Sequence, residues 1–487
     1  MKSIYRTGIF LVAMAMLTAA PSCKKLVDPE AAQEKIGAET VWGNDKTAAS
    51  VLTRLLAEMS WISESTNGYP INMALAADDL KVGAYISAST QQLYFNTNMS
   101  DPTQWWGYWY NYIYYTNDAV EQLTGSTVIS PAVRQYLLGE ARFVRAFCYF
   151  YLLNTYGEVP LVLTTDWTKT INMGRTPAAE IWAQIITDLK EAKSLLSKDY
   201  LHSNMTVSTA GDRYRPNKAA ASALLARVYL YMKDYENAEK EATEVISNPA
   251  YSFIDLNGVF LKNSKETIWQ LPAMTPGLNS QDGSAFILRK AYPTDPQGPT
   301  SSTPFLASDY LMAAFETGDL RATKWIGDSA GFKFINKYKY PFVDASKPNV
   351  EAIMMMRLGE QYLIRAEARI RNNKVSDGIA DLNALRTRAR GGNPGDLPDL
   401  STGMGQPAAE TAVEHERQVE LFTEWGHRWF DLKRNNRLDA IMTVVTPVKN
   451  GNTGQWQPFR QLFPLPAGEV ANAPGLRGHQ NPGYPQN

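Results

Sequence analysis

This sequence of 487 residues contains little cysteine or histidine, and neither basic nor acidic residues are in marked excess. The two cysteines, Cys23 and Cys148, are too few for a disulfide framework. The four histidines are scattered without HxxxH or CxxC spacing, so we predict no metal site. The 48 basic and 49 acidic side chains give a formal net charge of -1. A nucleic-acid binder normally carries a basic excess that neutralises phosphates, and we therefore expect no nucleic-acid partner.

Sequence motifs of common catalytic and nucleotide sites are also missing. The chain contains no GxSxG, Walker A or GxGxxG pattern, and we predict no cofactor. No EF-hand spacing is present, although acidic loop residues could supply oxygen ligands to calcium. Asp78 and Asp79 are adjacent in sequence, whereas the two carboxyls of a glycosidase must face each other across the scissile bond. A hydrogen-bonding or capping role therefore suits this pair better than catalysis.

The N-terminal segment has the pattern of a lipoprotein signal peptide. Lys2 and Arg6 precede the apolar run GIFLVAMAMLTAA, which is short for a membrane span, and PSC follows. We predict a signal peptide over residues 1–22, cleavage before Cys23, and a lipidated tether over residues 23–44. Several acyl chains would anchor the protein stably to a membrane. Pro21 is unusual at such a site, and the alternative is a secreted protein with a cysteine near its cleavage site.

Hydrophobic periodicity predicts a mainly α fold in one large domain, residues 45–487. Apolar residues recur at three- and four-residue steps from Asp45 to Met59. We predict further helices over 104–124, 131–155, 177–197, 214–233, 235–247, 350–372, 376–390, 407–424 and 427–434. Residues 131–247 and 350–434 resemble tetratricopeptide (TPR) helix pairs, which can stack around a continuous core. Residues 60–104 and 249–348 are rich in loop-forming residues and predict irregular structure.

The segment Gln104–Tyr115, QWWGYWYNYIYY, concentrates eight aromatic residues. Spacing places Trp106, Tyr110, Ile113 and Asn117 on one helix face, which we assign to the core. A second stripe, Tyr108, Tyr112 and Tyr115, is also assigned to the core. Trp105 follows the polar loop NMSDPTQ and is the better candidate for an exposed ring that holds a ligand.

Five segments and one helix motif together resemble the SusD/RagB family of Bacteroidetes surface lipoproteins. The segments are GEARFVRAFCYFYLLNTYGEVPLVL (139–163), KAAASALLARVYLYMKDYENA (218–238), YLIRAEARI (362–370), ERQVELFTEWGHRWFDLKR (416–434) and LFPLPAGEV followed by GHQNPGY (462–484). The family's W-x3-Y-x2-I-x3-N helix is matched by Trp106, Tyr110, Ile113 and Asn117. The resemblance extends from Cys23 to the C-terminus, with its parts in the family's order.

The resemblance implies a lipid-anchored, surface-exposed protein of the outer membrane that is not an enzyme. It would bind an oligo- or polysaccharide and deliver it to a partner SusC-like TonB-dependent transporter. Three alternatives stay open: capture of peptides by the same route, a glycoside-active enzyme, and a TPR-type scaffold that binds only protein.

The family builds its ligand surface from two regions that match residues 60–104 and 270–330 here. Pyranose C–H bonds pack on aromatic faces, and polar side chains must satisfy the sugar hydroxyls. Each ring could instead anchor its loop in the core. The candidate ligand-binding residues are Trp61, Tyr69, Asp78, Asp79, Tyr85, Trp105, Arg289, Tyr292 and Trp325.

Overall fold

The structure is a computed structural model that describes residues 38–63, 68–97, 99, 105–209, 211–288, 298–393 and 395–486. The predicted signal peptide over 1–22, the lipidation site Cys23 and most of the tether lie outside the described residues. Helices dominate, as predicted. Those of the first half are α2 (Ala38–Val41), α3 (Asp45–Ser63), α4 (Tyr69–Ala76), α5 (Ala88–Tyr94), α6 (Trp105–Leu123), α7 (Pro131–Tyr156), α8 (Trp167–Thr170), α9 (Ala178–Leu195), α10 (Lys218–Tyr231) and α11 (Tyr235–Ile246).

The second half mixes helices with short strands. Its helices are α12 (Asp282–Phe286), α13 (Asp309–Ala314), α14 (Arg321–Lys324), α15 (Leu358–Arg371), α16 (Val375–Ala389), α17 (Gln406–Leu421), α18 (His427–Arg434), α19 (Leu438–Lys449) and α20 (Ala467–Asn472). Two 3-10 turns are η2 (Leu256–Gly258) and η3 (Pro458–Gln461). In the described residues the strands form three antiparallel pairs: β1 (Leu80–Val82) with β3 (Phe305–Ala307), β2 (Thr267–Leu271) with β6 (Ile353–Arg357), and β4 (Ile326–Ser329) with β5 (Phe332–Ile335).

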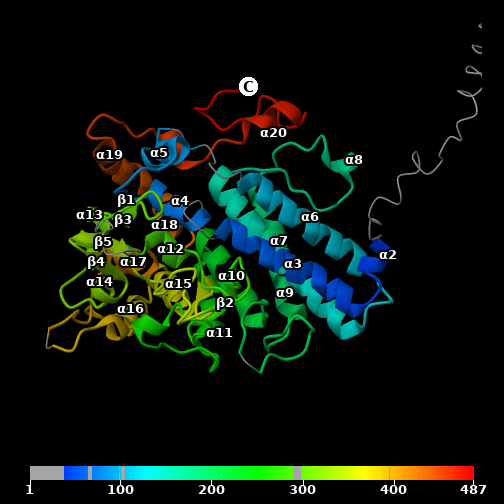
Figure 1. Cartoon of the computed structure of the whole chain (residues 1–487), viewed down its shortest axis with the longest axis horizontal. Coiled ribbons are helices and arrows are strands. Elements are labelled where there is room, and N and C mark those ends of the chain that lie inside the picture. Colours follow the sequence, from blue (N-terminus) through cyan, green and yellow to red (C-terminus); the bar gives the residue numbers. More distant parts are fainter. Residues whose placement is uncertain are drawn as a thin grey trace, which may run out of the picture.

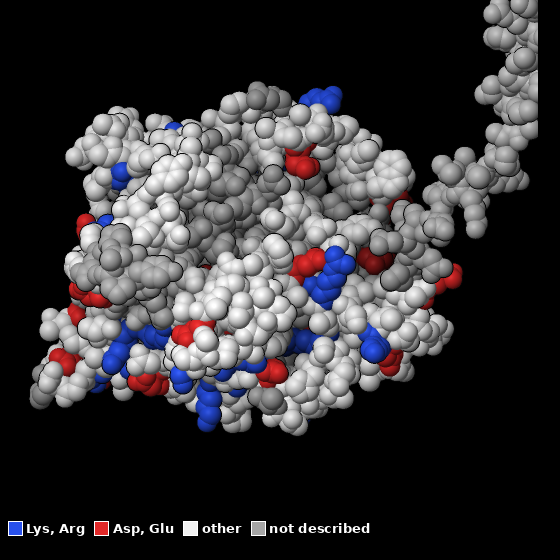
Figure 2. All heavy atoms as spheres, in the orientation of Figure 1, with Lys and Arg blue, Asp and Glu red and all other residues white. Residues whose placement is uncertain are grey.

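Antiparallel helix hairpins form the body of the molecule. Helices α3, α6, α7 and α9 lie side by side, while α10 packs on α11 and α15 on α16 (Figure 1). Helix α10 is buried at every position from Ala219 to Leu230, because its sequence is apolar or small on all sides. Charged side chains gather over the lower part of the face in Figure 2.

Buried ion pairs join neighbouring helices of this body. Arg145 on α7 binds both carboxylate oxygens of Asp188 on α9, at 2.8 and 2.6 Å. Arg227 on α10 makes the same two-pronged contact with Glu360 on α15, at 2.6 and 2.7 Å. Removing either partner of such a pair would leave the other charge buried and unpaired, which is strongly destabilising.

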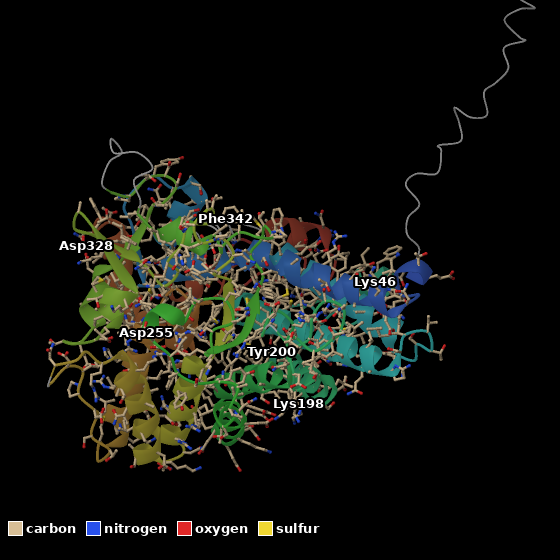
Figure 3. The ribbon with its side chains drawn as sticks, turned by 60° about the horizontal axis from the view of Figure 1, so that its bottom comes forward. Lys46, Lys198, Tyr200, Asp255, Asp328 and Phe342 are labelled. Atoms are coloured by element: carbon tan, nitrogen blue, oxygen red, sulfur yellow. The ribbon has the colours of Figure 1, made fainter. Side chains whose placement is uncertain are left out.

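The predicted irregular region 249–348 touches α3 through β2 and Pro272, while its residues Asp255 and Asp328 lie in the other half of the molecule. Figure 3 shows Asp255 and Asp328 in one half and Lys46, on α3, in the other. A separate apolar cluster fills this region and includes Trp325, Phe260 and Phe422. Tyr200, in the segment that follows α9, contacts strand β2, because its hydroxyl donates to the Ile268 carbonyl oxygen at 2.7 Å.

Some details of the secondary structure differ from the sequence predictions. Residues 69–76 and 88–94 are helical although 60–104 was predicted to be irregular, and α19 lies where no helix was predicted. Residues 353–357 form strand β6 rather than the start of a helix, because this apolar run pairs with β2. A short apolar run does not reveal its secondary structure by periodicity alone.

Candidate functional site

The two loop regions predicted to carry the ligand surface meet through a strand pair. Strand β1 pairs with β3, so that Leu80 faces Ala307 and Val82 faces Phe305. The pairing continues on one side, where the Ser308 amide donates to the Asp79 carbonyl oxygen at 3.0 Å. The pair therefore fixes the loop that follows β1 beside the segment that precedes β3.

Tyr85 lies in the loop that follows β1 and is 80% exposed. It borders a shallow hollow of about 180 Å³, lined also by Ile86, Ser87, Thr90 and residues 301, 304 and 305. The hydroxyl of Ser87 caps α5 by accepting the Thr90 amide at 3.2 Å, which fixes the wall beneath the ring. Of the nine candidates, Tyr85 most clearly offers a ring face to solvent from a defined hollow.

The sequence predicted that the Trp105 ring is exposed, and this prediction is wrong. Trp105 is the first residue of α6 and is fully buried. Its ring packs edge-on against Tyr69 at 4.7 Å between centroids, and Phe463 lies 5.7 Å away. Tyr69 is itself buried, and its hydroxyl is hydrogen-bonded to that of Thr155 at 2.6 Å. Both rings fill the core, which leaves neither of them a face for a ligand.

Trp325 is also buried, contrary to the prediction of a ring in an open loop. Its indole N–H donates to the Leu256 carbonyl oxygen at 2.9 Å, and Phe260 packs at 5.7 Å. The Lys337 ammonium lies 4.9 Å from the ring centroid. The loop-rich region needs its own core, and Trp325 supplies its largest apolar side chain.

Asp78 and Asp79 are buried structural carboxylates, so their place among the ligand-binding candidates is corrected. Arg428 donates to both oxygens of Asp78, at 2.7 and 2.8 Å. Asp79 accepts the Thr423 amide at 3.0 Å. Burial raises the pKa of Asp79 to about 7, with a further contribution from the neighbouring Asp78. Asp78 and Asp79 thus attach the segment that precedes β1 to α18 and to the turn before α18.

The remaining candidates are placed as follows. Trp61 is 61% exposed on α3 but does not line the hollow beside Tyr85. Arg289 and Tyr292 lie outside the described residues. Among the residues that the structure describes, no group of three or more His, Cys, Asp or Glu side chains could hold a metal ion.

A larger groove was missed from the sequence. It measures about 650 Å³ and lies between α6, the segment 160–173 and the segment 469–476. Trp106 and Tyr110, correctly predicted to pack inward, line it, and Tyr114 and Trp167 are exposed beside it. We name it the α6–α20 groove. The sequence contained one signal for this groove, because the segment TTDWTKT (164–170) places a tryptophan among polar residues. Tyr108 on α6, which the sequence analysis assigned to the core, is 40% exposed.

Stacked helical hairpins that carry exposed rings beside open hollows are typical of helical binding proteins. A family model described as "Starch-binding associating with outer membrane" matches residues 47–230, and a model of the SusD family matches residues 330–484. The chain belongs to the SusD/RagB family, a family associated with the outer membrane. Among the described residues, no helix has the length and apolar character that a membrane crossing requires.

Relatives of known name support this assignment. SusD-like protein P2 of Formosa agariphila is 27% identical over 393 residues, 71% of this chain and 73% of that protein. SusD-like protein P38 of the same organism is 24% identical and covers 91% of this chain and 93% of its own.

Solved structures share the fold at low identity. A laminarin binding SusD-like protein superposes with a TM-score of 0.71 at 21% identity, covering 90% of this chain and 99% of its own. Surface glycan-binding protein A from Bacteroides thetaiotaomicron gives a TM-score of 0.73 at 18% identity, covering 91% of this chain and all of its own. The structure of that protein in complex with laminarihexaose gives a TM-score of 0.72 at 19% identity, covering 90% of this chain and 99% of its own.

Proposed function

We propose that this protein is a cell-surface lipoprotein that captures an oligo- or polysaccharide and passes it to a SusC-like TonB-dependent transporter. Residues 1–22 would be removed, Cys23 would carry the lipid, residues to 44 would form a tether, and residues 45–487 would form the binding domain. The observation that carries the proposal is Tyr85, an exposed ring at a hollow where the two loop regions meet. Structural relatives named for laminarin and glycan binding support a sugar ligand.

The mechanism is capture without bond cleavage. The face of the Tyr85 ring packs against the C–H bonds of a pyranose, and the ring loses few rotors on binding. Ser301, exposed at the rim of the same hollow, offers a hydroxyl to the sugar. The carboxylates nearest in sequence, Asp78 and Asp79, are committed to Arg428 and Thr423, which leaves them unsuited to act as a general acid and base.

Affinity electrophoresis tests the proposal on the chain from Lys24 onward, which keeps every described residue. Gels that contain laminarin, starch or another neutral polysaccharide should retard the wild-type protein. Tyr85→Ala should weaken binding about tenfold, because a stacked ring contributes on the order of 1 kcal/mol beyond its buried area. Tyr108→Ala is the matched control: this tyrosine is 40% exposed on α6 and lines neither hollow.

Three results would contradict the proposal. Retardation by no polysaccharide, together with binding of peptides, would favour the peptide-capturing alternative. Release of shorter sugars by the purified protein would show an enzyme. Failure to co-purify a transporter with the tagged, lipidated protein from outer membranes would remove the delivery step and leave the capture step standing.

A further inference from the structure

The α6–α20 groove has three walls from distant parts of the chain. Tyr114 and Asn111 lie on α6, Trp167 lies on α8, and Glu469 and Asn472 lie on α20. In Figure 1, α20 and the C-terminal segment lie above α6, and α8 lies to the right of α20. None of these elements contributes to the hollow beside Tyr85, so the groove is a separate feature of the surface.

Two aromatic side chains at the groove are exposed, and one of them, Tyr114, also packs edge-on against Tyr115 with ring centroids 5.9 Å apart. Trp167 is 68% and Tyr114 is 53% exposed. Beside them, Trp106 and Tyr110 are packed together with ring centroids 4.9 Å apart. Neighbouring exposed rings and an apolar lining are the features by which a surface recognises a ligand.

The wall that carries Trp167 is held firmly to α6. The Asn117 amide donates to the Val162 carbonyl oxygen at 3.0 Å, and the Tyr110 hydroxyl donates to that of Pro160 at 2.7 Å. Glu121 accepts the Thr164 hydroxyl at 2.6 Å and the Thr165 amide at 3.0 Å. Burial raises the pKa of Glu121, but these hydrogen bonds outweigh it and hold the pKa below its ordinary value. A wall fixed before binding reduces the entropy lost when a ligand is immobilised.

The polar groups of the groove identify the class of ligand. Within the described part of the chain, the side chains of Asn111, Asn472 and Glu469 make no hydrogen bond, and each lines the groove. Lysine and arginine are absent from its described lining. Figure 2 likewise shows few basic atoms over the upper part of this face, where α8 and α20 lie. Amides and one carboxylate suit hydroxyl groups, whereas Glu469 would repel an anion.

We propose that the α6–α20 groove is a second glycan-binding site, which takes an uncharged oligosaccharide with its pyranose rings against Trp167 and Tyr114. The Asn111 and Asn472 amides donate hydrogen bonds to its hydroxyls and accept them, and the Glu469 carboxylate accepts them. The inference rests on the proposed function only for the class of ligand, because different residues carry the two sites.

Calorimetric titration of the purified protein with laminarihexaose, maltohexaose, cellohexaose and hexagalacturonate tests this site. At least one neutral hexasaccharide should bind, and Tyr85→Ala should leave part of that binding in place. In the Tyr85→Ala background, Trp167→Ala or Tyr114→Ala should weaken the remaining binding about tenfold or more. Tyr108→Ala, on the same helix as Tyr114, is the matched control and should have no effect. Because all four substituted rings are exposed, the variants should fold, which circular dichroism will check.

Each other outcome overturns the site. If Trp167→Ala and Tyr114→Ala bind as wild type while Tyr85→Ala abolishes binding, this inference fails and the proposed function stands. If no neutral hexasaccharide binds the wild-type protein at millimolar concentration, both fail. If hexagalacturonate binds more tightly than the neutral sugars, and Trp167→Ala weakens that binding, the assigned class of ligand is wrong.

Discussion

Asp78 and Arg428 form a buried ion pair although they lie 350 residues apart in the chain. The guanidinium donates to both carboxylate oxygens, at 2.7 and 2.8 Å, and both side chains are almost fully enclosed. The pair joins β1, in the first loop region, to α18 near the C-terminal part. The loop region that carries Tyr85 is thus fixed by the distant end of the sequence.

Asp78→Ala should lower the free energy of unfolding by about 3–5 kcal/mol, because it leaves the Arg428 charge buried and unpaired. Denaturation in urea measures the loss. Lys333→Ala is the control: its pair with Asp328 is 2.6 Å long but about half exposed, so the change should cost no more than about 1 kcal/mol. Equal losses in the two variants would show that burial of the pair has no energetic consequence.

Trp105→Ala should also act on stability. Removing this buried ring from its contacts with Tyr69 and Phe463 should cost about 3–5 kcal/mol in the free energy of unfolding. Trp61→Ala removes a ring of the same type that is 61% exposed, and about 0.5 kcal/mol or less is expected. Guanidinium denaturation compares the two. A Trp105→Ala protein as stable as wild type would contradict the assignment of this ring to the core.

The sequence predicted the helices well and the exposure of single rings poorly, for a physical reason. Periodicity identifies which face of a helix is apolar, so Trp106, Ile113 and Asn117 were assigned correctly to the interior. Loop residues show no such periodicity, so the sequence does not indicate which of their rings are buried. Trp325 therefore resembled a ligand platform, although the loop-rich region needs a core of its own and buries it there.

The α6–α20 groove illustrates a second limit. Its walls come from residues 106–114, 160–173 and 469–476, and no pattern in any one of these segments shows that they meet. Tyr85 could be proposed from sequence because it lies in a region that the family resemblance had already indicated. Its hollow became visible only once β1 was found paired with β3.

Cys23→Ala should release the protein from the outer membrane. Without the thiol no thioether to diacylglycerol can form, and the acyl chains that anchor the chain are lost. Fractionation of cells should find the wild type in the outer-membrane fraction and the variant in the soluble fractions. Cys148→Ala is the control: this thiol is buried in α7, and its removal should leave the protein in the membrane. A membrane-bound Cys23→Ala variant would disprove anchoring through Cys23.

Asp79 should make the stability of the protein depend on pH between about 4 and 7. Burial, with the neighbouring Asp78, raises its pKa in the folded state from 3.8 to about 7, while the unfolded chain keeps the ordinary value. Between these values the folded state binds more protons than the unfolded state. This group therefore lowers the free energy of unfolding as the pH rises through that window, and its contribution is constant below and above it.

Asp79→Asn should remove this effect while it keeps an oxygen for the Thr423 amide, which Asp79 accepts at 3.0 Å. Other carboxylates, such as Glu420, have a lowered pKa and act in the opposite direction, so the difference between variant and wild type is the quantity to measure. The free energy of unfolding of the variant, relative to that of the wild type, should increase by on the order of 2–4 kcal/mol from pH 4 to pH 7. Urea denaturation at half-unit steps of pH measures it. A difference that stays constant across this range would mean that Asp79 is ionised in the folded protein at pH 4, and that its burial is offset by the charges of Arg428 and Lys337.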